Sequence, residues 1–209
     1  MNKKSNRRHF SRGAALAAAL GTAVLASGCG GGVSLGYGSE VRQTNTLPAG
    51  VTDLGVKAYR ATAVGSGSTA ASQDLLTGGL GRSGLISTAA VPAYADPANP
   101  TADELRRNAL QSNYRGLVDV SAGGGFGVLY GPNIDLAGNN TLGEGLIPGV
   151  ESIGILDDAS GRKRVTMAVQ IPDSFNPDAP CVVLAPSSGS RGVYGAIGTA
   201  GEWGLKRHL

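Results

Sequence analysis

The chain has 209 residues, of which 41% are hydrophobic and 34 are glycine, so it can hold one domain with a core and many turns. Its formal charge of +3 comes from five basic residues before Cys29, since the remainder carries 13 basic and 15 acidic side chains. The basic balance therefore belongs to the N-terminal stretch, and no Lys/Arg patch interleaved with aromatic residues follows, which argues against nucleic-acid binding.

Residues 1–28 have the features of an export signal. A charged start over 1–12 is followed by an uncharged Ala/Leu stretch over 13–27, which is shorter than the roughly 20 apolar residues that span a bilayer. The sequence "RRHF" resembles a twin-arginine signal, and the ordinary secretory route also fits because the flanking Asn6 and Ser11 depart from the usual pattern. We therefore expect an exported protein, either secreted or periplasmic.

The two cysteines raise separate questions. Small residues precede Cys29, as in bacterial lipoprotein signals, so lipidation of Cys29 and cleavage nearby without an anchor are both open hypotheses. Cys181 lies in an apolar run and is interpreted as a small core residue, with a Cys29–Cys181 disulfide as the alternative. Two cysteines without suitably spaced histidines predict no metal site, and no cofactor is expected.

Residues 29–90 are rich in glycine, serine, threonine and alanine and contain only short apolar runs. No internal repeat is present, and the pattern does not define strands. We therefore expect an irregular N-terminal extension that wraps another surface.

A helix is predicted from residue 101 to about 117. Thr101 stands in the N-cap position with Glu104 three residues later, which is the capping-box pattern. Arg106 and Arg107 are interpreted as the solvated face of this helix, with contact to an acidic substrate as the alternative. Apolar residues at helical spacing predict the face that packs on a core, namely Leu105, Ala109, Leu110, Tyr114, Leu117 and Val118.

The next part of the chain predicts turns and strands. The glycine-rich "SAGGGFGVLYGPN" lacks a phosphate-binding motif between a strand and a helix, so it indicates a turn and a short strand. "VESIGIL" (150–156) and "RVTMAVQIP" (164–172) predict an antiparallel pair, and "CVVLA" (181–185) predicts a strand buried on both faces. Residues 91–209 therefore indicate the N-terminal part of a truncated α/β domain. We expect an incomplete α/β-hydrolase-like fold that has only the first strands and the N-terminal helix.

The apolar run leads into a serine- and glycine-rich loop, "SSGSRG" (187–192). In α/β-hydrolases the loop after the third strand supplies a backbone N–H group to the oxyanion hole. The candidates for that role are Gly189, Ser190, Arg191 and Gly192. The alternative is that the serines form a polar turn that caps the next helix.

Ser190 is the nearest approach to a nucleophile, since "SGSRG" partly matches the nucleophile-elbow pattern. A serine hydroxyl needs an activating base, yet the only histidines are His9, in the export signal, and His208. Glu202 is the only acid between Ser190 and His208, and this short interval cannot host the strands that carry a triad. Pairing of Ser190 with Lys206 is an alternative. No catalytic set is assigned to this chain, and Ser190 stays only a candidate nucleophile.

Several stretches between about residues 72 and 207 together resemble the N-terminal part of the bacterial D-3-hydroxybutyrate oligomer hydrolase family. In chain order they are "DLLTGGLGRSGL", "ADPANPTADELRRNAL", "NYRGLVD", "LYGPN" and "PCVVLAPSSGSRGVYGAIGTAGEWGLKR". The resemblance implies an exported serine esterase of α/β-hydrolase-like fold that cleaves small ester oligomers of 3-hydroxybutyrate to monomers in polyhydroxybutyrate degradation.

The resemblance also implies that members of the family are much longer and carry the catalytic serine and its partners beyond the matched part. We therefore expect an inactive N-terminal fragment, and Ser190 is not taken as the family's nucleophile. The alternative function is a non-enzymatic, lipid-anchored envelope protein with a binding or structural role, whose only membrane contact would be a lipid on Cys29.

Overall fold

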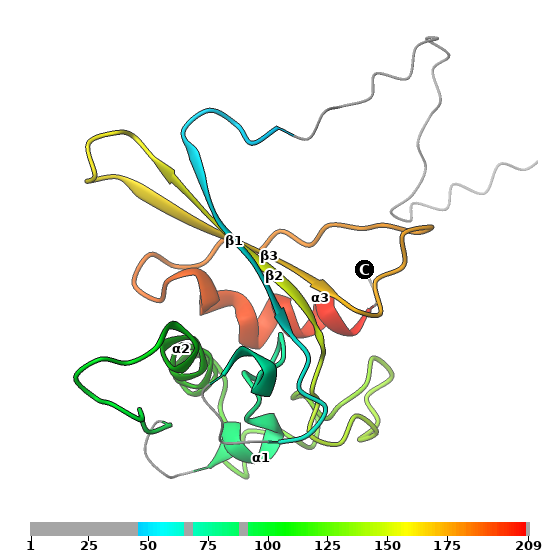
Figure 1. The fold of residues 1–209 in the computed structure, drawn as a ribbon. Coiled ribbons are helices and arrows are strands. Elements are labelled where there is room, and N and C mark those ends of the chain that lie inside the picture. The colour runs from blue at the N-terminus through cyan, green and yellow to red at the C-terminus, as the bar shows by residue number, and fades with distance from the viewer. Residues whose placement is uncertain (1–45, 65–68, 88–91, 208–209) are drawn as a thin grey trace, which may run out of the picture. The chain divides into compact units, whose positions relative to one another are not determined.

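Three antiparallel strands form the sheet of the structure, a computed structural model that describes residues 46–64, 69–87 and 92–207 (Figure 1). The spatial order is β1 (Val51–Tyr59), β2 (Gly149–Asp157) and β3 (Arg164–Pro172). The antiparallel pair that the sequence predicts at 150–156 and 164–172 is confirmed as β2 and β3. All described residues belong to one compact unit.

Strand β1 shows that residues 29–90 are not an irregular extension, so that prediction is wrong for the described part. β1 pairs with β2 along its length, from Val51 opposite Leu156 to Tyr59 opposite Gly149. Two short helices, η1 (Ala70–Ser72) and α1 (Gly81–Ile86), lie in the same stretch. The sequence did not reveal β1 because most of its side chains are exposed and its partner lies about 90 residues later in the chain.

Helix α2 (Ala102–Leu117) confirms the predicted helix and its N-terminus. The hydroxyl oxygen of Thr101 accepts the backbone N–H of Glu104 at 3.3 Å, and the Glu104 carboxylate accepts the Thr101 N–H at 2.8 Å. These are the two bonds of a capping box, which satisfy backbone donors that a helix start leaves without partners.

The buried face of α2 differs in part from the predicted one. Leu110, Tyr114 and Val118 are buried as expected, whereas Leu105 and Leu117 are 48% and 42% exposed. Arg106 and Arg107, which the sequence placed in solvent, are both buried. The assignment of these arginines to a solvated face is therefore wrong. Arg107 donates to the Gly78 carbonyl at 3.0 Å and to the Ser72 hydroxyl at 3.1 Å, and the partners of Arg106 are described below.

The hydrophobic core lies between α2, the short helices before it and the helices at the end of the described chain. Tyr114 meets Phe126 edge to face, with ring centroids 6.0 Å apart. The main buried members are Tyr59, Leu75, Leu76, Leu85, Leu110, Tyr114, Phe126, Ile197 and Leu205.

The turn that carries Leu75 and Leu76 into the core is built around the buried carboxylate of Asp74. This carboxylate accepts backbone N–H groups from Leu76, Thr77, Gly79 and Ile147, at distances between 2.8 and 3.1 Å. Because a buried carboxylate requires hydrogen-bond donors, these bonds make the turn a fixed part of the core.

Residues 181–185 do not form the predicted buried strand. They are extended, but no strand of the sheet pairs with them among the described residues. Val182 and Leu184 are 80% and 84% exposed, and Cys181 is only partly buried, so the interpretation of Cys181 as a core residue is wrong here. A buried strand needs neighbours on both edges, and the described sheet supplies none at this position.

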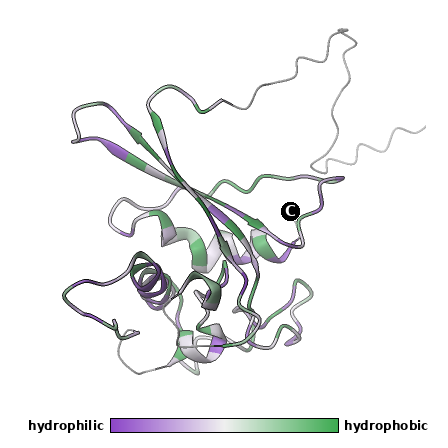
Figure 2. Cartoon of the chain, in the orientation of Figure 1, coloured by the Kyte–Doolittle hydropathy of each residue, from purple (hydrophilic) through white to green (hydrophobic). Residues whose placement is uncertain are grey.

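The chain after this segment is helical in short pieces: η2 (Val193–Ala196), η3 (Ile197–Gly201) and α3 (Glu202–Lys206). Side chains from both α2 and η2 reach the β2 residue Glu151, so these helices lie on the same side of the sheet (Figure 1). Hydrophobic residues also occupy strands and the extended coil after β3 (Figure 2). No helix in the described ranges has the length and apolar character needed to cross a bilayer.

Candidate active-site loop and its buried support

The candidate loop 187–192 rests on the C-terminal part of α2. The side-chain amide of Asn113 donates to the backbone carbonyl of Arg191 at 3.4 Å, and the Arg191 guanidinium donates to the carbonyl of Gly116 at 3.1 Å. A β-carbon at position 116 would overlap this guanidinium, so the absence of a side chain at Gly116 makes the contact possible. Helix α2 therefore holds the loop in place at Arg191.

The backbone of the loop leaves three of the four oxyanion candidates available as donors. The N–H of Arg191 closes a turn by donating to the Ser188 carbonyl at 3.1 Å. The N–H groups of Gly189, Ser190 and Gly192 donate to no backbone carbonyl of the described residues. An oxyanion hole needs such N–H groups directed at one oxygen, so these three positions keep the predicted role open.

The alternative role of the serines is confirmed as a polar turn, which the Arg191 N–H closes on the Ser188 carbonyl, but their role as a helix cap is wrong. The N-cap position of η2 is Gly192, with φ of 67°, and it makes no side-chain capping bond. The Ser187 hydroxyl donates instead to the neighbouring Ser188 carbonyl at 3.4 Å.

Ser190 has no base in the described part of the chain. Its side chain is exposed and makes no hydrogen bond to another described residue, whereas Lys206 is almost fully buried. The Lys206 ammonium group donates to the carbonyls of Gly131 and Ile134 at 2.7 Å each and pairs with Glu202 at 2.8 Å. Because its three donors are already used, the alternative pairing of Ser190 with Lys206 is wrong. His9, His208 and Cys29 lie outside the described residues.

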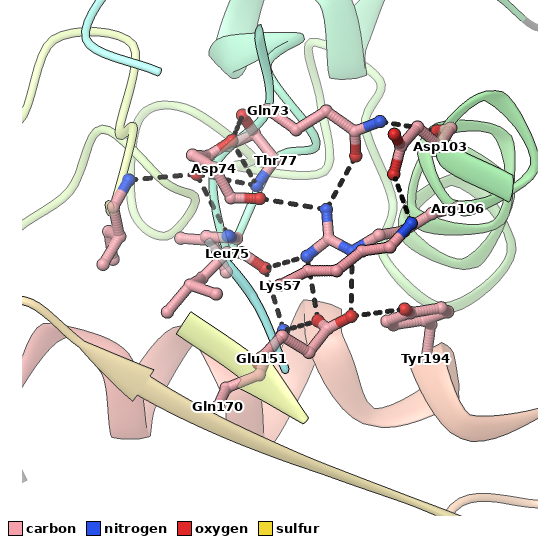
Figure 3. Close-up of polar contacts among 12 residues, drawn as sticks. Lys57, Gln73, Asp74, Leu75, Thr77, Asp103, Arg106, Glu151, Gln170 and Tyr194 are labelled. Carbon is pink, nitrogen blue, oxygen red and sulfur yellow. Dashed lines mark hydrogen bonds and ion pairs between the residues drawn. The ribbon is translucent and has the colours of Figure 1, made fainter. Parts of the chain in front are cut away.

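A buried ion pair joins Arg106 of α2 to Glu151 of β2 (Figure 3). The Arg106 guanidinium donates to both carboxylate oxygens of Glu151, at 3.1 and 2.9 Å. Its remaining donors reach the Gln73 side chain at 2.8 Å and the Asp74 carbonyl at 3.1 Å. A planar guanidinium suits this arrangement because it presents several donors in a fixed geometry.

Tyr194 connects this ion pair to the end of the loop. Its hydroxyl donates to Glu151 at 2.6 Å (Figure 3). The Arg106 guanidinium lies 5.5 Å from the centroid of the Tyr194 ring and 3.8 Å from that of the Tyr59 ring. Burial raises the pKa of the Tyr194 hydroxyl, and the negative charge of Glu151 adds to the rise. Tyr194 therefore stays a donor and holds the chain two residues after Gly192 against the sheet.

Glu151 is charged despite its burial. Burial alone would raise the pKa of its carboxyl, but hydrogen bonds from Arg106, Tyr194 and Gln170 outweigh that effect and hold the pKa below its usual value. The Gln170 amide nitrogen is 2.8 Å from a carboxylate oxygen and also reaches the Leu75 carbonyl at 3.1 Å. One carboxylate thus joins α2, β2, β3 and η2.

Sequence reasoning missed this network although one signal for it was present. Arg106 stands four residues before Leu110 and eight before Tyr114, so it belongs to the same helical stripe as two core residues. A charged residue in such a stripe requires a buried partner of opposite charge, and Glu151, the second residue of the predicted strand 150–156, was available.

The described residues contain no candidate metal site, because no cluster of three or more His, Cys, Asp or Glu side chains occurs among them. The contacts with α2 and the Tyr194–Glu151 hydrogen bond together hold a polar loop whose N–H groups at Gly189, Ser190 and Gly192 are available to a ligand.

Comparison with known proteins gives a consistent result. The model of the 3HB-oligomer hydrolase family matches residues 28–209. Curated relatives named D-(-)-3-hydroxybutyrate oligomer hydrolase include those of Burkholderia vietnamiensis, 59% identical over 170 residues, and Paraburkholderia xenovorans, 55% identical over 192 residues. A third, from Burkholderia ambifaria, is 54% identical over 193 residues. No solved structure matches the chain.

The alignments cover most of this chain but a small part of the relatives. They include 81%, 92% and 92% of this chain, and 23%, 26% and 25% of the proteins from B. vietnamiensis, P. xenovorans and B. ambifaria, respectively. The chain therefore spans about a quarter of the length of the curated relatives it matches.

Proposed function

Since this chain belongs to the 3HB-oligomer hydrolase family, we propose that it forms part of an ester hydrolase that cleaves oligomers of 3-hydroxybutyrate to monomers. The observation that carries the proposal is the family match over residues 28–209. The substrate class is that given in the names of the curated relatives.

In this reaction the chain supplies a scaffold and an oxyanion loop rather than the nucleophile. A serine oxygen attacks the ester carbonyl, and the N–H groups of Gly189, Ser190 and Gly192 stabilise the negative oxygen that forms. The ester C–O bond then breaks and the alcohol end of the substrate leaves with a proton. Water hydrolyses the acyl-enzyme and releases the acid end. The attacking serine and its imidazole base come from the part of the family's sequence that this chain does not span.

The test is an assay with the 3-hydroxybutyrate dimer. The chain by itself is expected to show no hydrolysis above background. A chimera that joins it to the unmatched part of the B. vietnamiensis relative is expected to hydrolyse the dimer and to retain activity with Ser190→Ala. Hydrolysis by the chain alone that Ser190→Ala abolishes would contradict the proposal and make Ser190 the nucleophile.

We also propose that the described residues are the beginning of an α/β-hydrolase-like fold. The support is the order of elements, in which the antiparallel pair β2 and β3 precedes the extended segment 181–185 and a loop that rests on helices. An experimental structure of the chimera would test this. A core without a parallel sheet beside 181–185 would contradict it.

Export of the protein is a further proposal, supported by the charged and apolar halves of residues 1–28. Mass spectrometry of the mature N-terminus separates the two forms considered. A lipid-modified Cys29 would indicate an envelope anchor, whereas an unmodified terminus elsewhere would indicate a soluble exported protein. If the chimera shows no hydrolysis and Cys29 carries lipid, the anchored binding protein becomes the better proposal.

A further inference from the structure

The two faces of the extended segment after β3 differ in exposure. Val183 contacts α3, since a β-carbon added at Gly204 would lie 3.3 Å from it, and it is 37% exposed. On either side, Val182 and Leu184 are 80% and 84% exposed. Alternate side chains of an extended chain point to opposite faces, so the two exposed side chains share the face that α3 does not cover.

The backbone of this segment is also open. Val182, Val183, Leu184 and Ala185 form no backbone hydrogen bond with any other described residue. Four apolar residues in a row, two of them β-branched valines, with unpaired backbone groups have the composition of a sheet interior rather than of a surface coil. An exposed run of this kind binds a further strand when one is supplied.

We propose that residues 182–185 form a strand-docking site, and that its occupant is an apolar strand from the part of the 3HB-oligomer hydrolase chain that this chain does not span. About three-quarters of the length of the curated relatives lies outside the aligned part, so the family supplies ample chain for such a strand. Pairing would satisfy the four backbone positions, and packing would cover Val182 and Leu184.

A second copy of this chain is the less suitable occupant. Stable interfaces between separate proteins bury about 1,200 Å² or more, which two four-residue segments cannot supply on their own. A strand from the unmatched part of the family's chain brings about three-quarters of the protein with it, so the pairing at residues 182–185 is only one part of a larger interface, whether the two parts are covalently joined or separate.

Hydrogen exchange measured by mass spectrometry tests the proposal directly. The backbone amides of residues 182–185 are compared in the full chain alone and in the chimera with the unmatched part of the B. vietnamiensis relative. We expect exchange in the chimera to be slower by about a hundredfold or more, because pairing in a core sheet protects amides. Equal exchange rates in the two proteins would overturn the proposal.

A binding experiment keeps the proposal testable if the chimera is insoluble. The tagged chain is co-expressed with the unmatched part of the relative, and co-purification is measured. The double variant Val182→Asp/Leu184→Asp is expected to reduce recovery about tenfold or more, since charge on both side chains opposes packing. Val128→Asp is the matched control, because Val128 is a 66% exposed valine in another loop, and it should leave recovery unchanged.

Failure to co-purify, or equal loss with Val128→Asp, would contradict the docking site. Protection of residues 182–185 in the chain alone, together with a dimer in analytical ultracentrifugation, would assign the site to a second copy instead. These measurements do not depend on the proposed hydrolase activity. A chimera that protects the segment but hydrolyses no ester would contradict the proposed function alone.

Discussion

The buried pair of Arg106 and Glu151 shows how single residues shape this fold. Moving two charges out of water costs several kcal/mol for each ion, which is recovered only when the geometry is good and the remaining polar atoms are satisfied. Here the two partners are 3% and 1% exposed, and the carboxylate also accepts bonds from Gln170 and Tyr194. The pair therefore contributes little net stability, but removing one partner leaves the other charge buried and uncompensated.

The first prediction follows from this asymmetry. Arg106→Met should lower the free energy of unfolding by about 3–5 kcal/mol, because it leaves the Glu151 carboxylate without its partner. The double variant Arg106→Met/Glu151→Leu should recover a large part of the loss. Urea unfolding followed by circular dichroism measures both. Lys57→Met is the control, because the exposed Lys57–Asp103 pair should contribute under about 1 kcal/mol.

If Arg106→Met lowered the free energy of unfolding by less than Lys57→Met does, the buried pair would not be coupled to folding. Equal losses in the single and double variants would show that the missing guanidinium matters through packing rather than charge.

The second prediction concerns pH. The pKa of Glu151 in the folded protein lies below its usual value, so the unfolded chain takes up the proton first as the pH falls. The contribution of the Glu151 carboxylate to the free energy of unfolding is therefore complete above the pKa of this group in the unfolded chain, roughly 4.3. It is lost as the pH falls through the lower pKa of the folded protein.

Urea unfolding between neutral pH and about pH 3 measures this contribution. Arg106→Met/Glu151→Leu is the comparison, since every other carboxylate is common to both proteins. The wild-type chain should lose more stability with acid than the double variant does. Parallel curves would contradict the assignment.

At the scale of elements, local signals were enough for some parts of the fold. The capping pattern at Thr101 predicts α2 correctly, and the alternation over 164–172 predicts β3. Strand β1 has no comparable signal, since its pairing with β2 is set by residues far away in the sequence. The apolar content of 181–185 indicates a strand, but no strand of the described residues pairs with this segment. The oxyanion role of residues 189–192 is a prediction from motif and element order, whereas the buried network next to this loop could be seen only in the fold.

The third prediction tests the turn around Asp74. Gly79 has φ of 80°, and a β-carbon there would overlap the Ser72 carbonyl, so Gly79→Ala adds a clash to an unfavourable backbone conformation. Gly138 has φ of 86° with nothing within 4 Å of a β-carbon, so Gly138→Ala has only the backbone cost, about 1–2 kcal/mol. Gly79→Ala should cost about 1–3 kcal/mol more, as overpacking does, in chemical unfolding. Equal effects of the two substitutions would show that the turn relaxes freely.

At the scale of the whole described unit, the sheet has one protected and one open face. Gln170 points toward Glu151 and the helices, so its neighbours along β3 point the other way. The side chains on that second face are apolar and between 38% and 56% exposed: Val165, Met167, Val169 and Ile171. β3 is also an edge of the sheet, and an exposed apolar edge strand promotes association between molecules.

The last prediction is that the chain in isolation associates with itself through β3, and that one lysine on the open face reduces this. Val169 is 56% exposed, so Val169→Lys removes apolar surface while changing the free energy of unfolding by no more than about 0.5 kcal/mol. A lysine on an edge strand also opposes pairing with a second strand, because its charge would be buried on pairing. Static light scattering against concentration should therefore show a smaller mean mass for Val169→Lys than for the wild-type chain. Leu129→Lys is the control, since Leu129 is 74% exposed but lies in a loop that offers no strand edge, and its scattering should match the wild type. A wild-type chain that stays monomeric at all concentrations would show that the apolar face of the sheet is tolerated in water without a covering element.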